Sequence, residues 1–552
     1  MDLSEAFELF LILGSVLISA RLLAPYVAGV YTNSRSRLER VFAPLEKLIF
    51  RALGVDALRV MGWKEYFLSA VIANAFAMAL AFVILMFQNF FPLDPQGFHG
   101  LSLGLAFQTV VSFGTNTNLQ HYNGESSLSY LSQMGAIQFL QFSSAATGIC
   151  FGVAMVRGFI TGSKGLGNFY SDFVRTITRI LLPFSLLSSV ALVWLGVPQT
   201  ISGYASVIGI EGIRQTIPVG PVASLVSIMQ IGTNGGGYYG ANSAYPLQNP
   251  NPATDVLELY LMMLLPTCLI FAFGRLLGKK REARPLLISA YSLYALNLLV
   301  AFLAPLPSAQ APGIEVRFGG FLSTFWTVTT TSTMTGSVNA SLYAMNPLAI
   351  LSAFMGMFVQ AAPGGVGSGL AYMLMYVLIT VFVVGLMSGR TPEYLGLKIG
   401  ARDLKLLMLA FLIHPLIILV PTILAYVSGA AAAVNAGSGP LGLTAIMYEF
   451  ASAASNNGSD FLGAAANTQF FNLSTAFVML IGRYAPLGLL MALSGSMIGR
   501  KRFFTTGLDT ASFAFSGVLV LSVLVLVVLT FLPFLALGPI LSYLRGMVNG
   551  FG

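Results

Sequence analysis

Gly232-Thr233-Asn234-Gly235-Gly236-Gly237 follows directly on a short apolar stretch, and this junction decides the fold of the chain. Three more clusters of Gly, Asn, Ser and Thr follow apolar stretches in the same way, at 114–118, 335–339 and 455–459. Counted between the glycines at 114, 232, 336 and 458, the intervals are 118, 104 and 122 residues, which indicates a fourfold internal repeat. Lipid cannot hydrogen-bond bare backbone groups, so such segments at membrane depth must be buried in protein or line a water-filled path. Four of them around one axis predict a ring of carbonyls, as in a cation selectivity filter.

The composition is that of an integral membrane protein. Hydrophobic residues make up 56% of the chain and charged residues 9%, and the mean hydropathy is +0.81. A membrane-spanning helix needs about 20 mostly apolar residues. Ten runs meet this requirement, near 6–26, 66–90, 129–156, 179–198, 256–274, 285–306, 346–388, 405–428, 470–498 and 508–537.

The runs are too long and unbroken for the alternating strands of a β-barrel, which favours helices. Each polar cluster is preceded by an apolar element too short to cross the membrane: Leu101 to Phe113, Pro221 to Ile231, Gly319 to Met334 and Leu441 to Ala454. Such elements must dip in and return. We therefore expect an all-α integral membrane protein with ten transmembrane helices, arranged as four helix–pore-helix–helix repeats plus one flanking helix at each end. The expected units are 1–63, 64–160, 161–280, 281–402, 403–502 and 503–552, of which the middle four are the repeats.

The basic residues indicate the orientation of the chain. Of the 28 Lys and Arg, 24 fall in five segments, each after an odd-numbered span: 21–64, 157–179, 275–284, 390–405 and 500–502. Basic loops stay on the cytoplasmic side. Both termini and the four polar clusters are therefore expected on the extracytoplasmic side, and the net charge of +8 indicates topology and not nucleic-acid binding.

The polar clusters suit a weakly hydrated monovalent cation. Glycine permits the positive φ angles that turn successive carbonyls toward one axis, and we expect this of Gly232, where a side chain would also intrude on the path. Asn and Thr can hold a loop from behind, and no ring of carboxylates is present to select calcium. The alternative is that the clusters are ordinary turns. The expected filter residues are Thr115, Asn116, Thr117, Asn118, Gly232, Thr233, Asn234, Gly235, Thr335, Gly336, Ser337, Asn456, Asn457 and Gly458.

Two further features point to an ion path. The seventh apolar run is cut by Pro363-Gly364-Gly365-Val366-Gly367-Ser368-Gly369, which predicts a gating loop at Gly364, Gly365, Gly367 and Gly369, with a tolerated kink as the alternative. Arg483 lies in the middle of the ninth run, where a charge is costly. We place Arg483 and Gln120 in the vestibule of the path, with a structural bond from Arg483 to filter-loop carbonyls as the alternative; His414 is expected to be a hydrogen-bonded packing residue.

Several motifs along nearly the whole chain closely resemble the KdpA family of potassium-binding subunits of Kdp transporters. They are Leu-Asp-Pro-Gln-Gly at 93–97 and the segments 111–118, 232–237, 241–244, 364–369, 389–396 and 456–459. The chain departs from the family pattern with Tyr245 for His, Gln248 for Glu, Leu342-Tyr343 for His-Asp, Gln360 for Glu, and Asp460 for a small apolar residue.

The resemblance implies ATP-driven potassium uptake across a prokaryotic inner membrane, within a superfamily of potassium transporters built from four such repeats. It also implies three partners: a P-type ATPase catalytic subunit similar to KdpB, a periplasm-facing accessory subunit similar to KdpC, and a small single-span peptide similar to KdpF. Membrane lipids surround the complex, and potassium is the transported ion, held by backbone carbonyls of the filter.

The sequence predicts no catalytic activity for this chain itself. Its three histidines have no metal-binding spacing, and it contains neither a phosphate-binding loop nor the Asp-Lys-Thr-Gly phosphorylation motif, so no nucleotide is expected to bind. Two alternatives remain: a stand-alone potassium channel or ion symporter of the same superfamily, and a nontransporting membrane scaffold.

Overall fold

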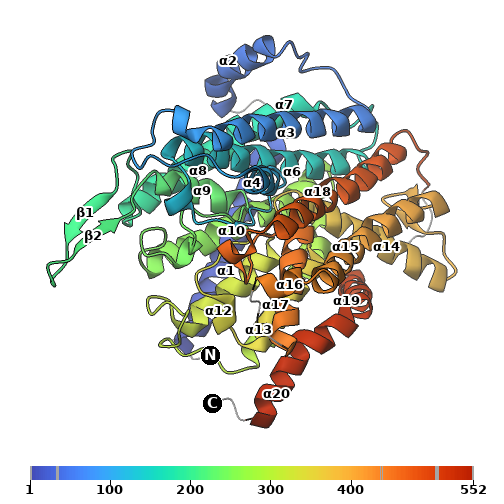
Figure 1. Cartoon of the computed structure of the whole chain (residues 1–552). Coiled ribbons are helices and arrows are strands. Elements are labelled where there is room, and N and C mark those ends of the chain that lie inside the picture. The colour runs from blue at the N-terminus through green and yellow to red at the C-terminus, as the bar shows by residue number, and fades with distance from the viewer. Residues whose placement is uncertain (1–2, 33–36, 435–436, 438, 504–508, 550–552) are drawn as a thin grey trace.

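The computed structural model describes residues 3–32, 37–434, 437, 439–503 and 509–549, and these residues are mostly helical. Part of the first basic segment (33–36) and the first residue of the tenth apolar run (508) lie outside the described residues. Figure 1 shows the helices gathered into one body, from which the hairpin of β1 (Ala205–Ile208) and β2 (Arg214–Ile217) projects.

Within the described residues, ten helical segments are long and apolar enough to cross a membrane, which confirms the expected all-α membrane fold. They are α1 (Leu3–Tyr31), α3 (Trp63–Met86), η2–α6 (Ser132–Arg157), α7–η3–α8 (Phe169–Trp194), α10 (Pro252–Leu276), η5–α11 (Lys280–Phe302), α14 (Ser368–Met387), α15 (Ala401–Val427), α18 (Gln469–Met497) and α19–η8–α20 (Phe513–Met547). The composite spans change element at Phe139 (α6), Thr176 (η3), Leu182 (α8), Ala283 (α11), Ala536 (η8) and Leu541 (α20, which runs to Asn549).

Four short helices precede the polar clusters, one in each repeat. They are α4 (Leu103–Gly114), α9 (Val222–Ile231), α12 (Gly319–Ser332) and α17 (Gly439–Ser455). The remaining elements are α2 (Arg37–Ala52), η1 (Gln88–Phe90), α5 (Gly124–Ser127), η4 (Asn242–Ala244), η6 (Leu342–Ala344), α13 (Pro347–Val359), β3 (Glu393–Tyr394), β4 (Leu397–Lys398), α16 (Ala430–Ala433) and η7 (Gly463–Ala466).

The repeats pack around the short helices, and the end helices lie outside them. In the first and fourth repeats, α4 contacts both α3 and α18, while α17 contacts α15 and α18. The flanking helix α1 packs along α10, and α19 packs along α11. Three expected boundaries fall inside helices, because α3 already begins at Trp63, η5 at Lys280 and α15 at Ala401.

The seventh apolar run is two helices separated by a loop. The side chain of Asn346 accepts a hydrogen bond from the Ala349 N–H at 2.8 Å, and Pro347 occupies the first turn, so α13 starts there. It ends at Gln360, whose φ of 54° breaks the helical hydrogen-bond pattern. The loop then runs to Gly367, and α14 begins at Ser368.

The sequence suggested that the second basic segment, 157–179, is a loop along its whole length, but part of it is helical. Arg175 and Arg179 lie inside the span Phe169–Trp194 because Arg179 has a buried partner, Glu46 of α2, with Nη2 and Oε2 at 2.6 Å. Burial alone would raise the pKa of Glu46, but the hydrogen bonds from Arg179 and Thr178 outweigh it and hold the pKa below its usual value. Pairing therefore extends this helix ten residues before the expected start of the fourth run.

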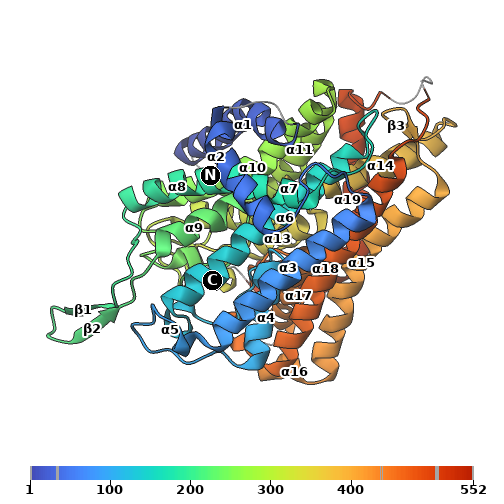
Figure 2. The same cartoon turned by 90° about the horizontal axis from the view of Figure 1, so that it is seen from above.

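The two small hairpins mark the two ends of the body. In Figure 2 the β1–β2 hairpin and β3 lie at opposite ends, and the long helices α3, α15 and α18 run between them. The β1–β2 hairpin connects α8 to α9, whereas β3 and β4 connect α14 to α15.

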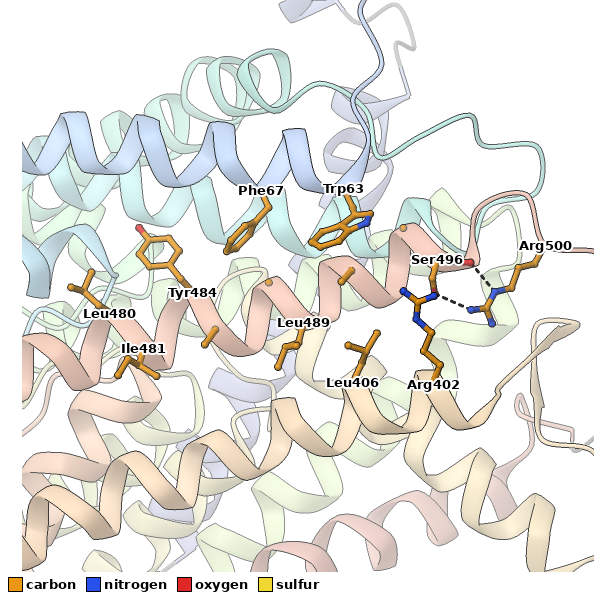
Figure 3. A pocket seen from close by; sticks show the side chains of 14 residues that line it. Trp63, Phe67, Arg402, Leu406, Leu480, Ile481, Tyr484, Leu489, Ser496 and Arg500 are labelled. Atoms are coloured by element: carbon orange, nitrogen blue, oxygen red, sulfur yellow. Dashed lines mark hydrogen bonds between the residues drawn. The ribbon is translucent and has the colours of Figure 1, made fainter.

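A groove of about 1160 Å³ lies between α3, α15 and α18. Figure 3 shows it as apolar along most of its length, with Trp63 and Phe67 on one wall and Arg402, Ser496 and Arg500 at one end. Arg500 is already paired with Asp403, with Nη1 and Oδ2 at 2.8 Å. None of the expected filter residues lines this groove.

Candidate cation filter

The four pore helices end in the same backbone bend. Within two residues of the end of each helix, one residue has a positive φ. These residues are Asn116 (65°), Thr233 (47°), Met334 (53°) and Asn456 (54°). The N–H of the next residue then bonds to the carbonyl five residues earlier: Thr117 to Ser112 (2.9 Å), Asn234 to Met229 (2.7 Å), Thr335 to Thr330 (2.8 Å) and Asn457 to Ser452 (2.9 Å). The fourfold repeat is therefore present in the hydrogen-bonding of the backbone.

This bend corrects the register that we counted from glycines. Gly114 is the last residue of α4, and the residue equivalent to Gly232 is Thr115. Gly336 and Gly458 are equivalent to each other and to Gly235, not to Gly232. The glycines misled the count because the bend fixes a conformation, and Asn, Thr and Met adopt the positive φ in place of Gly.

The four segments form a closed ring, each touching the next. Between the first and second, Asn116 Nδ2 donates to Thr233 O at 2.8 Å. Between the second and third, Ser337 Oγ donates to Gln230 Oε1 at 3.2 Å. Asn457 Nδ2 donates to Thr330 O at 3.0 Å, and Asn456 Nδ2 donates to Thr117 Oγ1 at 2.9 Å, which closes the ring. The structure thus brings together the fourteen expected filter residues, all of them buried.

Carbonyl oxygens of neighbouring segments lie close to the glycines of this ring. A Cβ added to Gly235 would lie 2.6 Å from Thr335 O and 3.0 Å from Asn457 O, which belong to two other segments. A Cβ on Gly336 would meet Asn457 O, and one on Gly458 would meet Thr117 O. Glycine is thus needed at these positions so that backbones can approach. The carboxyl ends of the pore helices, with their partial negative charge, also meet at this ring.

A strap behind each filter segment holds it in place. In three repeats the residue eight before the bend bonds to the residue three after it: Gln108 Nε2 to Leu119 O (3.1 Å), Trp326 Nε1 to Ser337 O (2.8 Å), and Tyr448 Oη with Ser459 Oγ (2.9 Å). The second repeat has Leu225 at this place, and Gln141 of α6 donates to Gly236 O at 2.9 Å instead. The sequence did not reveal these straps because four different side chains do one task.

Two residues of the third segment escaped the sequence analysis. Met334 makes the bend, and the hydroxyl of Thr333 pairs with that of Thr335 at 2.7 Å, as Thr115 pairs with Thr117 at 2.8 Å. The shared Thr-X-Thr pattern at 115–117 and 333–335 was the signal that could have found them.

Gly232 does not play the part expected of it. Its φ is −84°, and the positive φ belongs to Thr233. A Cβ on Gly232 would meet the side-chain amide of Asn234 and lie 3.0 Å from Ala145 Cβ, so it would point behind the filter and not into the path.

The loop between α13 and α14 lies directly against two filter segments. The Gly364 N–H donates to Ser332 O at 2.9 Å, at the end of α12, and the Val366 N–H donates to Thr233 Oγ1 at 3.0 Å. Gly364 and Gly367 have φ angles of 81° and 79°. A Cβ on Gly367 would meet Gly148 O of α6, and one on Gly369 would lie 2.5 Å from Pro363 O, so the loop is tightly packed.

Arg483 and Gln120 do not share one vestibule. Arg483 is buried, and its Nη2 donates to Ser144 O of α6 at 2.9 Å and not to a filter-loop carbonyl; Ser144 Oγ in turn donates to Asn116 Oδ1 at 3.0 Å. No acidic partner of Arg483 is found in the part of the chain that the structure describes. Gln120 lies after the first segment, where it bonds to both the N–H (2.9 Å) and the carbonyl (3.1 Å) of Gly237.

Three of the residues that depart from the family pattern, Tyr245, Gln248 and Gln360, are engaged in local contacts. Gln248 Oε1 accepts the N–H of Tyr238 at 3.0 Å, and Tyr245 stacks on Tyr239 with ring centroids 3.9 Å apart. Gln360 Nε2 lies 2.5 Å from His414 Nε2, so His414 is a hydrogen-bonded packing residue, as expected.

Residues 10–544 match the model of a family described as KdpA, potassium-transporting ATPase A subunit. Three relatives, each named potassium-transporting ATPase potassium-binding subunit, come from Caldanaerobacter subterraneus (41% identical over 97% of this chain and 99% of the relative), Synechocystis (40%; 97% and 98%) and Alicyclobacillus acidocaldarius (42%; 98% and 99%). Among solved structures, the potassium transporter TrkH from Vibrio parahaemolyticus matches with a TM-score of 0.53 and 15% identity over 90% of this chain and 100% of that one, which shows a common fold.

Proposed function

Because the chain belongs to the KdpA family of potassium-transporting ATPase A subunits, we propose that it is the potassium-binding and translocating subunit of an ATP-driven, high-affinity potassium uptake complex. The observation that supports this function is the closed ring of four polar segments, in which carbonyl oxygens of one segment lie close to the glycines of another. Carbonyl dipoles replace the hydration shell of a weakly hydrated cation, and potassium is such an ion.

The direction of transport follows from the expected orientation. Potassium enters the filter from the extracytoplasmic side of a prokaryotic inner membrane, and the basic segments face the cytoplasm. The chain supplies selection, and ATP hydrolysis is the task of a P-type ATPase subunit similar to KdpB. Accessory subunits similar to KdpC and KdpF complete the assembly.

The loop Gly364 to Gly369 acts as the gate beneath the filter in this proposal. Its support is position, since its N–H groups bond to Ser332 and Thr233 at the inner ends of two filter segments. Arg483 contributes a buried positive charge beside α6 at the same level of the path. A cation leaving the filter would meet this charge, which disfavours leakage straight through the chain.

The test compares the chain alone with the whole complex in proteoliposomes. We expect potassium-stimulated ATP hydrolysis and ATP-dependent uptake only with the catalytic partner present. A variant of the complex, Asn457→Asp, adds a charge to the filter ring. It should abolish potassium selectivity while the ATPase subunit is still present. Selective potassium flux through the isolated chain without ATP would favour the channel alternative and contradict the proposal.

A further inference from the structure

A small polar cavity lies at the mouth of the filter, on the side away from the Gly364–Gly369 loop. Its volume is about 40 Å³, more than the roughly 10–15 Å³ that a cavity needs to hold one water molecule. Filter glycines Gly336 and Gly458 form part of its wall, together with Gln120, Tyr122 and Asn242. The cavity therefore opens onto the filter and has room for about one ion or water.

Asp460 is the one charged residue among the described residues that line this cavity. It follows the last filter segment after Ser459, so its place is fixed by the bend at Asn456 and by the strap from Tyr448. No Lys or Arg of the described chain forms an ion pair with it. Asp460 therefore lies beside the filter without a Lys or Arg partner among the described residues. Burial and the nearby Glu449 raise the pKa of its carboxyl, so its ionised form is costly unless a cation is bound.

A second carboxylate increases this local negative charge. Glu449 of α17 is close enough to Asp460 to act on it electrostatically, and it is fully buried. One of its oxygens, Oε1, lies 3.0 Å from His121 Nε2, while Oε2 is without a hydrogen-bond partner among the described residues. His121 Nδ1 is itself held by Asn472 Oδ1 at 2.7 Å. The imidazole of His121 thus contacts Glu449 and Asn472 and not Asp460.

Unpaired charge beside buried backbone is costly, and a bound cation would remove that cost. Gln120 and Asn242 also line the cavity, but the amide oxygen of Gln120 already accepts the Gly237 N–H and that of Asn242 accepts the Ser243 N–H. The further ligands of such an ion would therefore be backbone groups of the filter and water. A divalent ion would need more, because calcium takes 6–8 oxygens that include several carboxylates. The chemistry on hand fits one monovalent cation.

We propose that Asp460 and the mouth cavity form a cation-binding site outside the four-segment filter, which holds one partly dehydrated potassium ion before it passes into the filter at Gly458 and Gly336. This inference rests on the proposed function, and it adds a binding step that the filter itself does not contain. The site raises the occupancy of the filter at low external potassium, since a cation bound there stabilises the ionised carboxylate and lies next to the filter.

The test measures potassium-stimulated ATP hydrolysis of the whole complex as a function of potassium concentration. Asp460→Asn keeps the shape of the side chain and removes its charge, so the potassium concentration for half-maximal activity should rise roughly tenfold, as for loss of one close, partly screened charge. The maximal rate should stay near that of the wild type. Asp460→Glu, which keeps the charge, should restore most of the affinity.

The matched control is Glu211→Gln, in the exposed turn of the β1–β2 hairpin, which removes one charge far from the mouth cavity. It should leave the potassium dependence unchanged. An equal effect of the two substitutions, or no effect of Asp460→Asn in a complex that still responds to potassium, would overturn the inference alone. A wild-type complex that does not respond to potassium would contradict the proposed function as well.

A second measurement does not depend on activity. Thallium(I), which substitutes for potassium, should give an anomalous density peak beside Asp460 in crystals of the complex, in addition to peaks in the filter. Filter peaks without a peak at Asp460 would show that no ion binds at the mouth cavity, even if the Asn variant is unstable.

Discussion

Glycines at the filter differ in what an added side chain would meet: carbonyl oxygens of other filter segments, or the protein behind the filter. The positions of Gly232 and Gly235 show this, because a Cβ on Gly232 would meet Asn234 behind the filter, whereas a Cβ on Gly235 would meet carbonyl oxygens of two other segments. Gly235 therefore contacts the ring that we propose binds the ion, and Gly232 contacts that ring only through Asn234.

The residue-scale prediction follows from that difference. Gly235→Ala should weaken potassium affinity more than Gly232→Ala does, because overpacking costs about 1–3 kcal/mol and here falls on the coordinating carbonyls. That range corresponds to roughly fivefold to a hundredfold in affinity. Gly232→Asp should displace Asn234 and admit other monovalent cations. The measurement is stimulation of the complex by potassium, rubidium, ammonium and sodium; a larger loss in Gly232→Ala than in Gly235→Ala would contradict the assignment.

How much of the site the sequence could predict depends on what each residue does. Thr, Asn and Gly in the clusters are recognisable because they suit bent backbone, and they were placed in the filter in advance. Met334 was missed because nothing in a methionine side chain signals a positive φ. The straps were missed because Gln108, Trp326 and Tyr448 share a position and not a chemistry.

At the scale of elements, the broken seventh run makes the most specific prediction. Deleting Gly365, Val366 and Gly367 removes the N–H that bonds to Thr233 Oγ1 and shortens the loop between α13 and α14. Passive rubidium flux into liposomes should then rise, and the uptake per ATP hydrolysed should fall, while filter affinity changes little. Val366→Ala keeps the backbone and its N–H, so it should remain coupled. Full coupling in the deletion variant, without a leak, would make the loop a structural kink.

The lengths of elements were predictable, but some of their limits were not. An apolar run reports how much backbone can lie in lipid, which is why ten spans were expected and ten are found in the described residues. A polar residue can extend a helix when a distant partner compensates it, and Arg179 does so through Glu46. That partner lies on α2, far away in the chain, so local sequence could not show the pairing.

At the scale of the whole molecule, the remaining prediction is orientation. The ten candidate spans of the described residues predict both ends of the chain on one side, and the basic loops predict that this side is extracytoplasmic. The β1–β2 hairpin then lies outside, whereas η5, between α10 and α11, lies inside.

Both native cysteines are buried, so Cys150→Ala and Cys268→Ala give a background for single cysteines. In that background, Glu211→Cys should react with an impermeant maleimide on intact cells, and Lys280→Cys only after permeabilisation. The reverse labelling pattern would show that the chain has the opposite orientation. The filter mouth would then face the cytoplasm, and uptake through this filter would have no outward-facing opening.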